Sequence, residues 1–303
     1  MEMAYKHFLS PIILLLLPTL FQLAIAVAPI AKPGCQDHCG NISTPYPFGT
    51  TKDCYLDESF EIVCDEAASP PRVFIRKTNM EVLNIGDGAA VVKGPIMSSN
   101  CSGRQSGPPA NLEGSPFFFS FSNLFIAVGC NIRALLTEIG SQVSGCDSTC
   151  VSYYNHTTII FGQEINSLCS GKHCCVARAP FRMQVFNPSL ETKNESQDSS
   201  GCKLTFLADQ EWVAFSDINN PQVFHDREYV PVVLAWVMDY KLWKYDPKTM
   251  SCKYFLLQHS LTLAYECSCR KGYEGNPYLG CVGKVNVQEK TLCCCLAVQQ
   301  LRF

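Results

Sequence analysis

Short apolar runs separated by turn residues make up most of the chain. Pro, Gly and Asn recur roughly every ten to fifteen residues, and the runs between them are rich in Val, Ile, Phe and Tyr. Such runs predict β-strands, and long stretches with a helical period are absent downstream of the N-terminus. The predicted strands include residues 59–64, 72–76, 117–121, 124–128, 181–186 and 229–238. We therefore predict an all-β protein with many loops.

The N-terminus has a different pattern. A short basic start precedes an apolar run over residues 8–27, and the small residues Ala24 and Ala26 follow the apolar centre. These are the three parts of a secretory signal peptide, so we predict that residues 1–26 are a cleaved signal. The alternative, an uncleaved anchor, is disfavoured by Pro18. No later run reaches the roughly 18 apolar residues of a membrane span, so no span is expected beyond the signal peptide.

Cysteine usage supports export. Three of the 19 cysteines lie at residues 293–295, which leaves 16 upstream. An exported chain uses an even set of this size as a disulfide framework. Zinc binding is the rival interpretation for Cys35-x3-Cys39, but further cysteines crowd this spacing, and we expect no metal site. The predicted class is thus a secreted chain of small, disulfide-rich extracellular β-domains.

Four Asn-x-Ser/Thr sequons are candidate glycosylation sites once the chain is exported. They begin at Asn41, Asn100, Asn155 and Asn194.

Charge and motifs exclude several functions. With 24 basic and 27 acidic residues the chain has a net charge of −3, which does not suit nucleic acid. The six histidines show no metal-ligand spacing, and no Gly-x-Ser-x-Gly motif is present. A glycosidase would need two facing carboxylates, which the scattered acidic residues do not identify. We therefore expect no catalytic residue, no cofactor and no enzymatic activity.

The chain divides at a polar stretch. Residues 193–201 lack periodicity and predict a linker or exposed loop. We accordingly divide the chain into a cysteine-rich domain (residues 27–190), a second region (191–252), a short third unit (253–281) and an irregular tail (282–303). The second region holds all three tryptophans, of which Trp236 is predicted to be core and Trp243 exposed.

The third unit resembles the second half of an EGF-like module. The run Cys267-Ser-Cys-Arg-Lys-Gly-Tyr-Glu-Gly275 closes at Cys281. Two glycines permit a tight hairpin, and disulfides replace a missing core. The resemblance implies that Cys269 pairs with Cys281, and Cys267 then most simply pairs with Cys252. Without acidic residues ahead of the first cysteine, calcium binding is not expected.

The run Cys35-Gln-Asp-His-Cys-Gly-Asn-Ile-Ser-Thr-Pro-Tyr-Pro-Phe-Gly49 resembles the galacturonan-binding module of plant wall-associated receptor kinases. The resemblance continues through Cys174-Cys175 and Val230–Trp236 to Gly272–Leu279, so it covers residues 35–281. It implies that residues 27–190 are galacturonan-binding-like and residues 191–252 resemble the C-terminal region of that family's ectodomain. No kinase motif follows, so we expect a truncated, secreted member of the family.

The resemblance implies acidic pectin, meaning homogalacturonan or its oligomers, as the ligand. A polyanion requires cations, and Arg72, Arg76 and Lys77 form the densest basic group of the first domain. On a strand Arg72, Phe74 and Arg76 share one face. The alternative interpretation is that these three charges belong to a solvated edge strand and bind no ligand. The next candidates are Lys172, Arg178 and Arg182. The alternative function is a decoy or co-receptor ectodomain that binds peptides or other ectodomains.

Overall fold

The computed structural model describes most of the chain between residues 28 and 283. The described ranges are 28–86, 88–138, 141–149, 159–160, 163–164, 169, 173–192, 201–216, 222–239, 245–257 and 262–283. The predicted signal peptide, Asn155, Asn194, Lys172, Trp243 and nearly all of the tail lie outside them. The described residues are mostly strand, so the predicted all-β, disulfide-rich class is confirmed.

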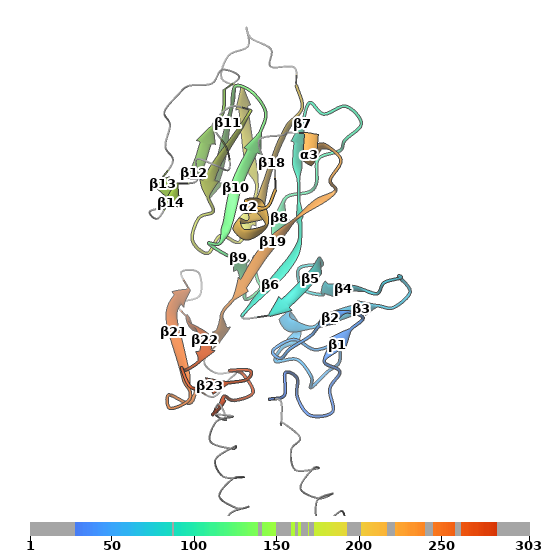
Figure 1. The fold of residues 1–303 in the computed structure, drawn as a ribbon, viewed down its shortest axis with the longest axis vertical. Helices are drawn as coiled ribbons and strands as arrows, with labels where there is room; N and C mark the ends of the chain where they lie inside the picture. The colour runs from blue at the N-terminus through green and yellow to red at the C-terminus, as the bar shows by residue number, and fades with distance from the viewer. Residues whose placement is uncertain are drawn as a thin grey trace, which may run out of the picture.

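Two sheets enclose the main core (Figure 1). The first has six strands in the order β3 (Ile62–Asp65), β4 (Arg72–Ile75), β5 (Met80–Gly86), β6 (Ala89–Pro95), β19 (Tyr229–Trp236) and β9 (Phe117–Phe119). The second has four in the order β15 (Cys174–Arg178), β10 (Asn123–Val128), β18 (Lys203–Asp209) and β7 (Met97–Ser99).

Smaller elements surround this pair of sheets. Two three-stranded sheets are β12 (Ser141–Asp147), β11 (Ile132–Glu138), β17 (Pro188–Thr192) and β20 (Met238–Asp239), β22 (Thr262–Cys269), β21 (Met250–Leu257). Two-stranded pairs are β1 (His38–Cys39) with β2 (Ile42–Ser43), β13 (Ile159–Ile160) with β14 (Gln163–Glu164), β16 (Val185–Phe186) with β8 (Ala110–Asn111), and β23 (Tyr273–Glu274) with β24 (Val282–Gly283). The described helices are η1 (Glu58–Phe60), α2 (Gln210–Ala214) and α3 (Gln222–His225). In the described part of the chain, none of these is long enough to cross a membrane.

Strand burial follows the sequence pattern. Every residue of β10 is buried, which explains why its sequence is apolar without alternation. The predicted run over residues 181–186 is a strand only at β16, because Arg182 has a left-handed backbone with φ 58°. Residues 59 and 60 belong to η1, Glu61 forms an isolated bridge with Gly49, and β3 starts at Ile62.

The run Tyr46-Pro-Phe-Gly49, here called the hallmark loop, and Trp236 build one end of the core. Tyr46, Phe48 and Trp236 are 6%, 1% and 3% exposed. The Phe48 ring packs edge-on against Trp236 with centroids 5.1 Å apart, and against Phe60 at 5.3 Å. The predicted core position of Trp236 is therefore confirmed.

The polar stretch near residue 193 does not separate two sheets. β19 pairs with β6 along its length and with β9 at its end, and β18 pairs with β10 and β7. The segments on both sides of residue 190 thus contribute strands to the same two sheets. The domain boundary drawn after residue 190 therefore remains a prediction from the sequence.

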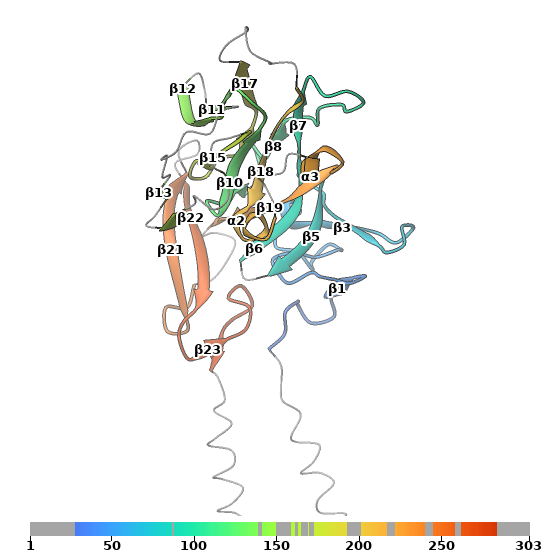
Figure 2. The same cartoon turned by 45° about the horizontal axis from the view of Figure 1, so that its top comes forward.

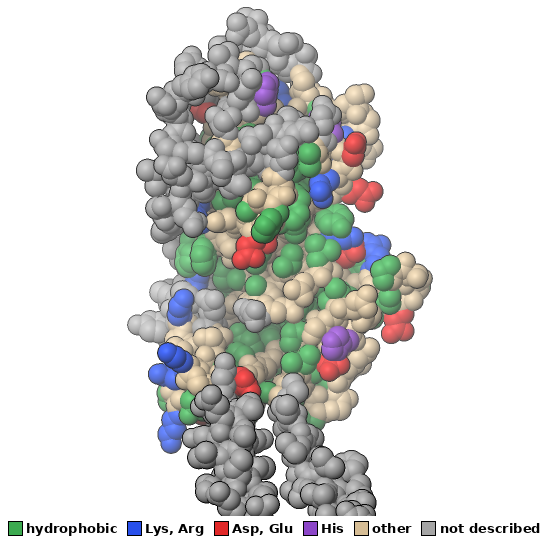
Figure 3. All heavy atoms as spheres, in the orientation of Figure 1, with side chains coloured by type: hydrophobic (Ala, Val, Ile, Leu, Met, Phe, Trp, Pro, Cys, Tyr) green, Lys and Arg blue, Asp and Glu red, His purple; other side chains and the backbone are tan. Residues whose placement is uncertain are grey.

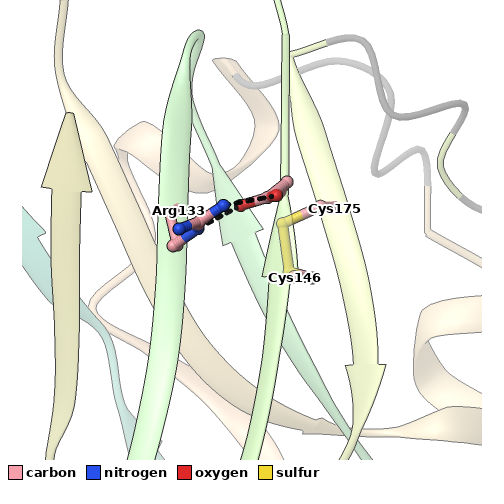
Figure 4. Close-up of polar contacts among 4 residues, drawn as sticks. Arg133, Cys146 and Cys175 are labelled. Atoms are coloured by element: carbon pink, nitrogen blue, oxygen red, sulfur yellow. Dashed lines mark hydrogen bonds and ion pairs between the residues drawn. A yellow bond between two sulfur atoms is a disulfide. The ribbon is translucent and has the colours of Figure 1, made fainter. Parts of the chain in front are cut away.

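Disulfides join elements that are distant in the chain. Seven are described: Cys35–Cys54, Cys39–Cys64, Cys101–Cys202, Cys146–Cys175, Cys169–Cys174, Cys252–Cys267 and Cys269–Cys281. The last two are the pairs expected from the EGF-like resemblance. Figure 4 shows Cys146 of β12 bonded to Cys175 of β15, which links two sheets, beside the ion pair between Arg133 and Asp147 (3.0 Å).

The third unit, residues 253–281 and from here on the C-terminal unit, is docked against the N-terminal loops. The Asn276 side-chain amide donates hydrogen bonds to the backbone carbonyls of Ile30 (3.1 Å) and Tyr46. Figures 1 and 2 show the β21–β22 hairpin on the side of the molecule opposite β3 and β4, with β23 at its lower end.

Candidate functional site

A groove of about 890 Å³ lies at one end of the six-stranded sheet. Its floor is the outer face of β4, β5 and β6, and its walls are residues 103–111 and 225–229. Cations, acids and aromatic rings all line it: Arg72, Phe74, Glu81, Lys93, Arg104, His225, Asp226, Arg227, Glu228 and Tyr229.

Strand alternation explains the floor. Val73 and Ile75 of β4 are buried in the core, so Arg72 and Phe74 face outward. Glu81 pairs with Phe74 across β4 and β5, and therefore points the same way.

One carboxylate holds two cations on this floor. Glu81 accepts from Arg72 Nη2 at 2.5 Å and from Lys93 Nζ at 2.7 Å. The hydrogen bond from Arg72 and the charge of Lys93 hold the pKa of the Glu81 carboxyl below its usual range, although partial burial opposes this. Because one negative charge faces two positive ones, the trio keeps a net positive charge.

Each of the two cations also lies over a ring. Lys93 Nζ is 4.4 Å from the centre of the Tyr229 ring, and the Arg72 guanidinium is 5.0 Å from that of Phe74. This arrangement presents cations beside aromatic faces, which suits a ligand that carries both carboxylates and sugar rings.

Arg104 joins the two walls. Its Nη1 donates to the backbone carbonyls of Phe224 (3.0 Å) and His225 (2.7 Å) at the end of α3. Burial lowers the pKa of Arg104, and the charge of Asp226 opposes that shift. On the wall formed by residues 225–229, the Arg227 guanidinium lies 5.2 Å from the Trp212 ring centre.

The structure places the sequence-predicted basic group around and beyond this groove. Arg72 lines it, whereas Arg76 is ion-paired with Glu61 at 2.6 Å and does not line it. Lys77 is exposed and forms no ion pair within the described residues. Of the next candidates, Arg178 ends β15 and Arg182 lies on a loop near Phe118 and Phe181.

Sequence reasoning missed Lys93, Arg104, Arg227 and Tyr229. They come from three segments that are distant in sequence, and only strand pairing brings Tyr229 opposite Pro95 beside Lys93. Lys93 is the one charged residue of the run Val91-Val-Lys-Gly-Pro95, which favours an outward position, but the run does not reveal the neighbouring strand.

A second recess, of about 450 Å³, lies between the hallmark loop and the C-terminal unit. Hydrophobic side chains line it at the lower middle of Figure 3, and none of its described lining residues is charged. Burying an unpaired carboxylate there would be costly. The recess therefore does not suit a polyanion, and the groove does.

Two predicted glycosylation sites are described. Asn41 and Asn100 are both exposed, as glycan attachment requires. Glycosylation at all four sequons remains a prediction.

Comparison with known proteins adds a family. A family model described as Wall-associated receptor kinase galacturonan-binding matches residues 35–93, and one described as Wall-associated kinase matches residues 166–245. No solved structure matches the chain.

Three curated proteins of Arabidopsis thaliana are similar over most of the chain. Wall-associated receptor kinase-like 4 is 35% identical over 68% of it, wall-associated receptor kinase-like 6 is 31% identical over 82%, and wall-associated receptor kinase-like 3 is 33% identical over 83%. The matched regions span 28%, 44% and 39% of these relatives' lengths.

Proposed function

The chain belongs to the wall-associated receptor kinase-like family, and from this premise we propose that it binds acidic pectin in the groove. The observation that carries the proposal is the overlap of two findings. The segment that matches the galacturonan-binding family model, residues 35–93, contains Arg72, Glu81 and Lys93, which form the groove floor.

The chemistry of the groove fits a polyuronate. Guanidinium and ammonium groups bind carboxylates through charge-assisted hydrogen bonds. Phe74 and Tyr229 beside them offer apolar faces to the sugar rings. Because the net charge of the whole chain is −3, this attraction must be local.

The environment of Glu81 suits ligand binding rather than proton donation. A glycosidase needs a carboxylic acid whose pKa is raised so that it can donate a proton. Glu81 has the opposite perturbation, because Arg72 and Lys93 lower its pKa. We propose that galacturonan oligomers incubated with the protein keep their lengths, which mass spectrometry can check.

The proposal includes the compartment. Seven described disulfides support an oxidising, extracellular setting, and the ligand class would place the protein's work in the cell wall.

Two charge-matched double variants test the site. The first variant, Arg72→Gln with Lys93→Gln, removes two cations of the groove. The second, Arg76→Gln with Lys77→Gln, removes two cations that the sequence predicted to bind the ligand but that do not line the groove. Binding of de-esterified galacturonan is measured by calorimetry at two salt concentrations, after secretion and circular dichroism have shown that each variant folds.

The groove variant should bind about 4- to 25-fold more weakly, since each of the two exposed charge contacts is worth about a two- to fivefold change in affinity. Wild-type binding should weaken as salt rises and when the carboxylates are methyl-esterified. Equal losses in both variants would reject the groove as the site. Absence of wild-type binding at low salt would reject pectin as the ligand.

A further inference from the structure

The groove opens onto a continuous face of the six-stranded sheet. Along β19, Val230, Val232 and Leu234 are buried in the core, so the alternate residues face outward. Residues that pair directly across strands share a face. The outward pairs are Tyr229–Pro95, Pro231–Lys93, Val233–Val91, Ala235–Ala89 and Ala235–Phe118.

This face therefore runs from the groove at Tyr229 to Phe118 on the edge strand β9, where Phe118 itself is only 8% exposed. Ala235 lies six positions after Tyr229 along the strand, which corresponds to about 20 Å at about 3.3 Å per residue. The described outward residues of β6 and β19 beyond Lys93 are uncharged and half-buried. Nothing along this stretch of the two strands would repel a carboxylate.

The far end repeats the chemistry of the groove. The Arg182 guanidinium lies 5.7 Å from the Phe118 ring centre and 5.3 Å from that of Phe181. Lys93 and Tyr229 form the corresponding cation–ring pair in the groove. We call Phe118, Phe181 and Arg182 the far corner.

The far corner has a defined backbone and an exposed ring. Phe119 N–H donates to the Met183 carbonyl (2.8 Å), and Ala179 N–H donates to the Asn123 carbonyl (3.3 Å). These bonds bracket Phe121 and Phe181, which therefore lie at the midpoints of two facing segments. Their side chains are 61% and 65% exposed, although phenylalanine has no polar group to gain from water.

We propose that the far corner is a second contact for the same acidic polysaccharide, which would leave the groove along the outer face of β6 and β19. The inference rests on the proposed function. Continuity with the groove and the repeated pairing of a cation with a ring identify the occupant. Phe181, which is 65% exposed, would stack against a sugar ring, and Arg182, whose Nε and Nη2 are buried, would attract a carboxylate through its positive charge.

A second contact on one polymer raises affinity through effective concentration, and only for ligands long enough to reach both contacts. Ligand length therefore separates the far corner from the groove. Oligomers shorter than the span from Tyr229 to Phe118 should use the groove alone, and longer ones should use both.

The test measures the affinity of de-esterified galacturonan oligomers of increasing length for wild type, Arg182→Gln and Phe181→Ser. Arg133→Gln is the matched control, because it also removes one exposed arginine, on β11. Secretion and circular dichroism establish that each variant folds.

Both far-corner variants should bind short oligomers like the wild type and long oligomers about two- to fivefold more weakly, with the control unchanged at all lengths. If both variants bind long oligomers as tightly as the wild type does, this inference is overturned while the proposed function stands. The exposed phenylalanines would then serve a partner of another class. An equal loss at every length would also overturn it. If the wild type binds no oligomer, the proposed function and this inference both fail.

Discussion

Glu81 controls how much positive charge the groove presents. Its carboxylate is ion-paired with Arg72 Nη2 at 2.5 Å and with Lys93 Nζ at 2.7 Å. Without Glu81, both cations would interact with a ligand instead. Replacing Glu81 with Gln should therefore tighten the binding of de-esterified galacturonan, by about two- to fivefold per released cation. The change is measured by calorimetry at low salt.

Glu61→Gln is the matched control for this prediction. It releases Arg76, which does not line the groove, and it removes the same single negative charge. If both variants gain equally, net charge alone explains the effect and Glu81 has no special place in the site.

The same residue should make stability depend on pH. The pKa of Glu81 is lowered in the folded protein, so its ionised form stabilises the fold above its unfolded pKa. That contribution disappears as pH falls through the lowered, folded pKa. The difference in unfolding free energy between wild type and Glu81→Gln should thus be largest near neutral pH and shrink in acid. A difference that stays constant from neutral pH to pH 3 would contradict it.

At the scale of elements, the C-terminal unit depends on one side chain. The Asn276 amide bonds the carbonyls of Ile30 and Tyr46, and its Oδ1 accepts from the Tyr278 N–H (2.9 Å). Asn276→Ala should lower the free energy of unfolding by about 1–3 kcal/mol, because it removes these three hydrogen bonds, although the Ile30 carbonyl keeps its bond from the Tyr46 N–H (2.8 Å).

Denaturant unfolding measures this loss, and limited proteolysis should cut the C-terminal unit faster in the variant. Asn111→Ala is the control, because Asn111 is exposed and its amide reaches only Glu113. Equal stability of the Asn276 variant and wild type would show that these hydrogen bonds do not contribute to docking of the unit.

Some elements could be predicted from the sequence and others could not. The run Leu124–Val128 is apolar throughout because both faces of β10 are covered, and it was identified as a strand. Residues 181–184 (Phe-Arg-Met-Gln) alternate apolar and polar side chains as a strand would, yet they form a loop because Arg182 adopts a positive φ that composition does not reveal. Apolar content predicts burial well, but not the local backbone.

Pro231 shows the same limit in a paired strand. A proline has no backbone N–H to donate to a neighbouring strand, so it argues against a central strand. β19 nevertheless lies between β6 and β9, and the conflict is resolved because β9 pairs only with Leu234–Trp236. Pro231 thus lies where β19 is paired on one side.

The candidate site was only partly accessible to sequence reasoning for a related reason. The basic cluster around Arg72 is local in the chain and was found, while Lys93, Arg104 and Tyr229 join it only through tertiary pairing. The family resemblance supplied the ligand class, which residue chemistry alone did not specify.

At the scale of the molecule, disulfides should account for nearly all cysteines. Fifteen of the 16 cysteines from Cys35 to Cys281 are disulfide-bonded, and the remaining one, Cys150, lies outside the described residues. Thiol titration of the secreted, denatured and unreduced protein should find at most the three cysteines at residues 293–295 reactive. Many reactive thiols upstream of residue 282, or retention in the cytosol, would contradict an oxidised extracellular fold.

The path of β19 has a mechanical consequence. Its first residue, Tyr229, belongs to a wall of the groove, and after Val237 the chain continues into β20, which pairs with β22 of the C-terminal unit. A pull on a polymer held at the groove would therefore pass along covalent backbone into a hairpin that Cys252–Cys267 cross-links. The Asn276 hydrogen bonds would carry part of the same load to the N-terminal loops. Under tension the sheet and the C-terminal unit should move as one body, so force on the ligand would reach the far end of the molecule without first unfolding it.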